Sequence, residues 1–254
     1  MSNASMNTAA MINFVKRFFA VLSFALAIPA LIQMAPAAHA AERKFLISSF
    51  EDVRINGSVN VSITTDRGVS ASAEAADRKV LDRISLRKSG RQLIISVAPD
   101  TNDNSRYSAD EPVMVRLSSD VVKTVTHSGS GTVSLDKLGG RDARVRLSGF
   151  GVLTIDDIDS DTLTITMNGG GQLVMAGQAK KGRITLLGSS IFDGSDLTLE
   201  TLDLVQRGPV SSHVFVEREA DISNYGTGII QIDGQPNCSV QTDGAAQIIC
   251  DPKR

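Results

Sequence analysis

The sequence has few aromatic residues and few side chains of the kinds that build metal or nucleophilic sites. Aromatic residues make up 4% of its 254 residues, tryptophan is absent, and there are two tyrosines, two cysteines and three histidines. Platforms that stack sugars rely on tryptophan or tyrosine, so the composition does not favour one. The net charge of −2 and the lack of a basic run argue against a nucleic-acid partner. We predict no cofactor, metal or catalytic site.

Long apolar runs are also scarce, and the clearest one covers residues 18–32, directly after two basic residues. It is shorter than the about 20 residues that a membrane-spanning helix needs. Ala38 and Ala40 then place small residues where signal peptidase requires them. We predict a signal peptide over residues 1–40, cleaved after Ala40, with an uncleaved anchor as the alternative. The remaining chain, residues 41–254, is then exported without a membrane span to the periplasm, the outer membrane surface or the medium.

Glycine, by contrast, is abundant and regularly spaced. Gly129, Gly149 and Gly169 recur every 20 residues, and the series continues at intervals of 18 to 20 through Gly188, Gly208, Gly226 and Gly244. Short alternating runs of apolar and polar residues lie between these glycines, as expected for half-buried strands. Their apolar positions align in columns: Val133, Leu153, Leu173 and Phe192; Leu135, Ile155 and Met175; Leu147, Met167 and Leu186. A period of roughly 20 residues indicates stacked coils with glycine at the corners.

The predicted fold is all-β: a single-stranded right-handed parallel β-helix of about 18–20 residues per rung. Regular rungs are expected over residues 113–251, and a less regular, strand-rich part over residues 41–112. Within that part we expect a hairpin turn at residues 66–68 and a short helix at residues 76–84. A β-sandwich built from regular hairpins is the alternative.

Residues 99–112 are polar and lack periodicity. Irregular segments on a rigid scaffold often carry binding contacts. The segment is therefore either a binding loop or a simple connection between coils.

The two cysteines, Cys238 and Cys250, flank Gly244 near the end of the repeats. In an oxidising compartment an even number of cysteines predicts a disulfide. This one would fasten the last rung, which has no following rung to pair with. A redox site or a metal site is the alternative, although the spacing and the lack of nearby histidines favour neither.

Several segments of the sequence resemble a known bacterial family. The segment FEDVRING at residues 50–57, VNVSI at 59–63 and LIIS at 93–96, followed by the serial SGSG, SGFG and NGGG motifs, resemble the head GIN domain family, labelled "putative auto-transporter adhesin". The resemblance covers most of residues 45–250. It implies a secreted β-helical protein linked to surface adhesion, and it carries no catalytic residues across.

The densest acidic cluster consists of Asp156, Asp157, Asp159 and Asp161, at one corner of a predicted rung. Grouped carboxylates can serve hydrolysis of polysaccharides, but the equivalent corners of neighbouring rungs are not acidic, which is typical of a solvated turn. His127 and His213 match no catalytic motif and are expected at the surface.

Three functions follow from these observations. The first is an exported, non-enzymatic module of the cell envelope that binds a glycan, a protein or another envelope component. The second is a polysaccharide-active lyase or hydrolase that uses the acidic corner. The third is a structural protein that self-associates through unpaired strands at its ends.

Overall fold

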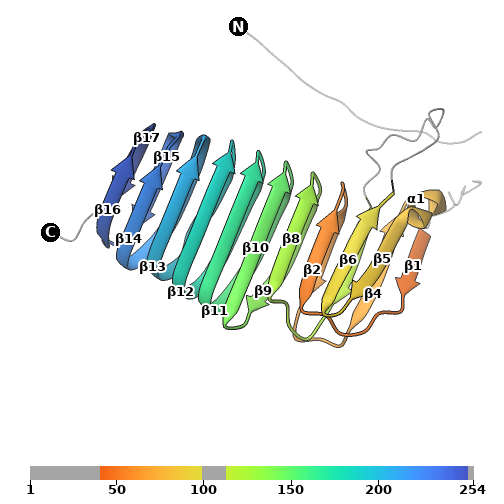
Figure 1. Ribbon diagram of the computed structural model, residues 1–254. Helices are drawn as coiled ribbons and strands as arrows, with labels where there is room; N and C mark the ends of the chain where they lie inside the picture. Colours follow the sequence, from red (N-terminus) through yellow and green to blue (C-terminus); the bar gives the residue numbers. More distant parts are fainter. Residues whose placement is uncertain (1–40, 99–112, 251–254) are drawn as a thin grey trace, which may run out of the picture. The chain divides into compact units, whose positions relative to one another are not determined.

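The structure, a computed structural model, describes residues 41–98 and 113–250 and shows a β-solenoid of about six turns with a strand-rich N-terminal part (Figure 1). The predicted fold class is confirmed. In the described part of the chain no helix is long and apolar enough to cross a membrane. The predicted signal peptide and the segment at residues 99–112 lie outside the described residues.

Each turn of the solenoid contributes one strand segment to each of two faces, which we call face A and face B. Later strands are long because they run from face B around a corner onto face A without interruption. The regular turns consist of β8 (Thr124–Gly129), β9 (Thr132–Gly139), β10 (Asp142–Gly149), β11 (Val152–Gly169), β12 (Gln172–Gly188), β13 (Ile191–Arg207), β14 (Pro209–Asn224), β15 (Thr227–Asp233), β16 (Asn237–Thr242) and β17 (Ala245–Cys250). Face A carries β8, β10, the second halves of β11 to β14, and β16; face B carries β9, the first halves of β11 to β14, β15 and β17.

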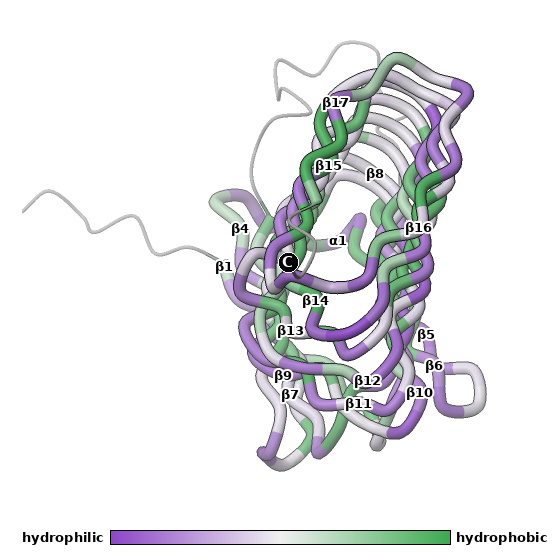
Figure 2. Tube along the Cα trace, turned by 90° about the vertical axis from the view of Figure 1, so that its left-hand side faces the viewer, coloured by the Kyte–Doolittle hydropathy of each residue, from purple (hydrophilic) through white to green (hydrophobic). Residues whose placement is uncertain are grey.

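The interior is filled by the columns of apolar side chains that the alternating pattern predicts. Leu153 lies between Val133 and Leu173 in the parallel register, and Met167 lies between Leu147 and Leu186. All six side chains are buried. Figure 2 shows the turns stacked one behind another. The buried apolar side chains form one hydrophobic core. Burial of a leucine or methionine side chain contributes about 1.5–3 kcal/mol, so each added turn extends the same core.

The glycine series forms a ladder at the corner that leads from face A to face B. Gly169 has a φ of +122°, and its backbone lies so close to the turn before it that a Cβ would meet the carbonyl oxygen of Gly149 at 2.5 Å. The same close approach relates each glycine to the one before it along the predicted series, from Gly149 to Gly244. The predicted alignment of turns therefore holds beyond Gly188, where the sequence motif becomes degenerate.

The N-terminal part is threaded out of sequence order. β2 (Asp52–Asn56) and β3 (Asn60–Thr64) form a turn whose corner, Gly57, lies against Gly129. On their other side they pair in parallel with β6 (Gln92–Val97) and β7 (Met114–Ser118), which come later in the chain. Regular rungs therefore begin with β2 and β3, earlier than residue 113.

The solenoid end nearest the N-terminus is closed by antiparallel strands and one short helix (Figure 1). β5 (Ile84–Ser89) pairs with β6, while β4 (Ser70–Ala75) joins β7 to β1 (Ala41–Phe45). The predicted hairpin at residues 66–68 is wrong, because β7 lies between β3 and β4. The predicted helix is present but shorter: α1 (Arg78–Asp82) contacts β1, β4 and β5 and buries Leu81.

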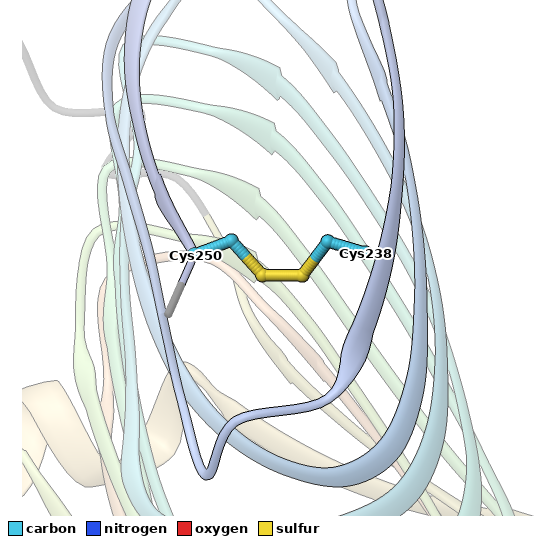
Figure 3. Close-up of a disulfide and its surroundings, with 2 residues drawn as sticks. All are labelled: Cys238 and Cys250. Carbon is cyan, nitrogen blue, oxygen red and sulfur yellow. A yellow bond between two sulfur atoms is a disulfide. The ribbon is translucent and has the colours of Figure 1, made fainter. Parts of the chain in front are cut away.

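The opposite end is fastened by the predicted disulfide. Cys238 on β16 and Cys250 on β17 are joined across the interior of the last turn, with their Cα atoms 6.7 Å apart (Figure 3). Val240 continues the inward column of Ile222 but is 44% exposed, because no described strand lies beyond it. In the chain-entropy model a loop of this length contributes about 3 kcal/mol, which offsets the weak burial of this turn.

Candidate functional site

The acidic corner is held by ion pairs that cross from one turn to the next. Lys137 Nζ lies 3.2 Å from Asp157 Oδ2, and Lys180 Nζ lies 2.7 Å from Asp161 Oδ1. Arg141 Nε approaches Asp161 from the preceding turn at 3.8 Å. The register thus places cations of the neighbouring turns beside these carboxylates. In the sequence alone the same residues appear only as separate corners of different composition.

Arg141, Asp161 and Lys180 border a polar groove of about 560 Å³ that runs along this edge of the solenoid. Its walls alternate in charge through Arg141, Asp161, Lys180 and Glu200, and Glu200 pairs with Arg218 at 2.8 Å. The hydrogen bond from Lys180 lowers the pKa of Asp161. A general acid needs a raised carboxyl pKa, and every resolved carboxyl shift among the described residues is downward. The groove therefore carries paired charges, and the lowered pKa of Asp161 favours its ionised form.

The prediction that both histidines lie at the surface is wrong for His127, whereas His213 does face outward. His127 is fully buried in the inward column between Ile55 and Leu147, and its Nε2 lies 3.0 Å from the carbonyl oxygen of Gly131. Burial lowers the pKa of His127, so the neutral form is favoured. His213 faces outward on face B, where it lies 2.7 Å from Asp233 and lowers the pKa of that carboxyl. Within the described part of the chain, no group of three or more histidine, cysteine, aspartate or glutamate side chains could hold a metal ion.

Face A carries a set of arginines that sequence reasoning missed. Its N-terminal strands β5, β6 and β2 extend the face beyond β8, so that outward side chains align in columns across seven strand segments. Five exposed arginines fall on two adjacent columns, and we call them the arginine patch: Arg54, Arg87, Arg144, Arg146 and Arg183. They are spread over the sequence from residue 54 to residue 183, so no basic run marks them, and only the register brings them together.

The fold and these faces define the class of protein: a β-solenoid that presents broad, charged and hydroxyl-rich sheet surfaces. Within that class, the chain belongs to the family described as "Putative auto-transporter adhesin, head GIN domain", whose model matches residues 49–236. The resemblance found in the sequence is thereby confirmed.

Solved structures of proteins from Bacteroides and Parabacteroides species share this fold. A putative adhesin from Bacteroides fragilis has a TM-score of 0.75 at 18% identity, over 84% of this chain and 97% of that one. A putative lipid binding protein from Parabacteroides distasonis has a TM-score of 0.62 at 16% identity, over 84% and 95% of the two chains. A putative adhesin from Parabacteroides merdae has a TM-score of 0.61 at 15% identity, over 85% and 96%. No curated protein matches the chain.

Proposed function

We propose that this protein is an exported, non-enzymatic binding module of the bacterial cell envelope that acts as an adhesin. Membership in the adhesin family supports this function. The observation that carries it is face A, a long and regular sheet surface on which the five arginines of the patch point outward and form no ion pair with any described carboxylate. The disulfide between Cys238 and Cys250 and the leader at residues 1–40 support export.

The acidic corner supports binding better than catalysis. Asp157 and Asp161 are engaged by cations from adjacent turns, and the pKa of Asp161 is lowered. Glycoside hydrolysis by two carboxyl groups requires that one of them be protonated at working pH. The resolved shifts of the described carboxyls favour the opposite protonation state.

The test is to incubate the purified protein with isolated bacterial envelope fragments and to measure co-sedimentation and newly formed sugar ends together. We expect saturable co-sedimentation without new sugar ends, and no co-sedimentation of heat-denatured protein. An N-terminal sequence that begins at Ala41 in protein recovered from an exporting host checks the export step.

The enzymatic alternative gives a different result in the same assay. If sugar ends accumulate with time, and if Asp161→Asn abolishes them while the protein remains folded, the protein is an enzyme and the proposal is wrong. Absence of both binding and cleavage also contradicts it.

A further inference from the structure

The arginine patch is ordered by the parallel register of face A. In one column Arg87, Arg54 and Arg146 alternate with Ile94 and Thr126. In the adjacent column Arg144 and Arg183 flank Thr164, and the column continues to Asp203. Adjacent strands lie about 4.8 Å apart, so arginines two strands apart within a column are separated by about 9.6 Å at the backbone.

These arginines have no anionic partner in the described part of the protein. No ion pair within 4.0 Å joins any of the five to a carboxylate. In the second column Asp52 lies two strands before Arg144, and Asp203 directly follows Arg183. Neither carboxylate lies within 4.0 Å of an arginine of the patch. On the grooved edge of the same solenoid, by contrast, Lys137 and Lys180 each meet a carboxylate of an adjacent turn. The patch therefore gathers like charges that repel one another, which does not stabilise the fold.

The geometry of the patch selects an extended partner. From Arg87 on β5 to Arg183 on β12 the patch crosses seven strand segments, or roughly 29 Å along the solenoid axis. Thr126 and Thr164 each lie between two arginines of a column. Two further threonine hydroxyls lie directly beside the arginines, at Thr124 next to Arg144 and at Thr166 next to Arg146. Guanidinium groups bind carboxylates in a bidentate manner, and hydroxyls offer hydrogen bonds to sugar hydroxyls.

We propose that face A binds an extended polysaccharide bearing carboxylate groups, which lies along the solenoid axis across the arginine patch. This inference rests on the proposed adhesin function and names its ligand class and site. The patch holds the polymer by charge and hydrogen bonding and does not require sugars to stack on aromatic rings. This agrees with the composition of the chain, which lacks tryptophan and has two tyrosines.

Other polyanions fit the patch less well. Single-stranded nucleic acids are held by stacking of their bases on aromatic side chains, and the two arginine columns contain none between Arg87 and Arg183. An anionic membrane surface is bound by a basic face that also inserts apolar side chains. Ile94 is the only apolar residue between the arginines of the patch, and it is half-buried.

The experiment measures binding of polygalacturonate to the whole purified protein at low and high salt. Fully methyl-esterified polygalacturonate is the matched probe, because it keeps the sugar backbone and lacks the charge. We expect the acid form to bind, the ester not to bind, and the affinity to fall as salt screens the charges. Arg54→Gln with Arg146→Gln should weaken binding about tenfold, as the loss of two exposed charge pairs predicts.

The control variant carries Arg67→Gln and Arg78→Gln, which remove the same charge from exposed positions away from face A. It should bind as the unaltered protein does. Both variants change exposed side chains, and their urea midpoints verify that the fold is retained.

Three results would overturn the inference: equal binding of the ester, equal weakening by the control variant, or binding of single-stranded DNA or anionic vesicles without binding of polygalacturonate. The envelope assay separates this failure from failure of the proposed function. If the patch variant still co-sediments with envelope fragments, the ligand assignment is wrong and the adhesin function stands. If the unaltered protein does not co-sediment, the function itself is wrong.

Discussion

At the scale of single residues, the corner glycines are the positions least able to accept a side chain. Gly169→Ala would place a Cβ 2.5 Å from the carbonyl oxygen of Gly149, at a backbone φ of +122°. That carbonyl accepts a hydrogen bond from the N–H of Gly170 at 2.9 Å, so it cannot move away freely. We expect the free energy of unfolding to fall by about 3 kcal/mol or more, measured as a lower urea midpoint.

Gly68→Ala is the matched control for this substitution. Its Cβ would meet nothing within 4 Å, and its φ lies outside the left-handed region. We expect a change within about 0.5 kcal/mol. Equal midpoints for the two variants would show that the glycine ladder does not constrain the corner.

His127 makes the stability of the core depend on pH. Burial lowers its pKa below the ordinary value of 6.5, so the unfolded chain binds the proton more tightly than the folded one. Its contribution is fully present above about pH 6.5 and is lost as the pH falls below that value. We expect His127→Leu, which copies Leu147 of the next turn, to flatten the fall in urea midpoint between pH 7 and pH 5.

The variant His213→Gln provides the comparison, because it removes the outward histidine and leaves His127 in place. The fall between pH 7 and pH 5 should persist in it. Carboxyls with lowered pKa, such as Asp161 and Asp233, contribute stability that is lost at still lower pH, so this window separates them from His127. A fall that is unchanged in His127→Leu would contradict the assignment.

At the scale of elements, the sequence predicts each turn of the regular solenoid but not the order in which turns stack near the N-terminus. Alternation fixes which side of a strand faces inward, and the glycine spacing fixes the corner, so the columns through Leu153 and Met167 follow from local pattern. The pairing of β2 with β8 joins segments separated by the whole of β3 to β7. No local signal marks that pairing. Nor does one mark the position of β7 between β3 and β4, which makes the hairpin prediction at residues 66–68 wrong.

The surface could be predicted even less than the core. Outward side chains experience weak selection by packing, so their identities follow no period. The partners of Asp157 and Asp161 and the neighbours of Arg54 become visible only when the register is known. The surface prediction for His127 is wrong for a different reason: His127 stands two residues after the buried Val125, so alternation places it on the inward side. A polar residue is unexpected there, and only the structure shows that its ring lies within hydrogen-bond distance of a turn carbonyl.

At the scale of the whole molecule, a solenoid of equivalent turns should tolerate the loss of one complete turn. Deletion of residues 150–169 joins Gly149 to Gly170, and Gly149 and Gly169 occupy the same place in the register. Val133 would then pair with Leu173 and Val145 with Ile184, so both inward columns continue. Because each turn contacts only its neighbours, we expect a folded protein whose urea midpoint and m value are both reduced, the m value by about a tenth.

Deletion of residues 160–169 alone is the control, since it removes half a turn and would carry face A residues onto face B. Circular dichroism should show native strand content for the full-turn deletion and its loss for the half-turn deletion. The full-turn deletion also removes Asp157 and Asp161 but keeps all five arginines of the patch, so it should still bind polygalacturonate. Equal disruption by both deletions would mean that the turns are not interchangeable, and that the stack depends on contacts specific to each turn.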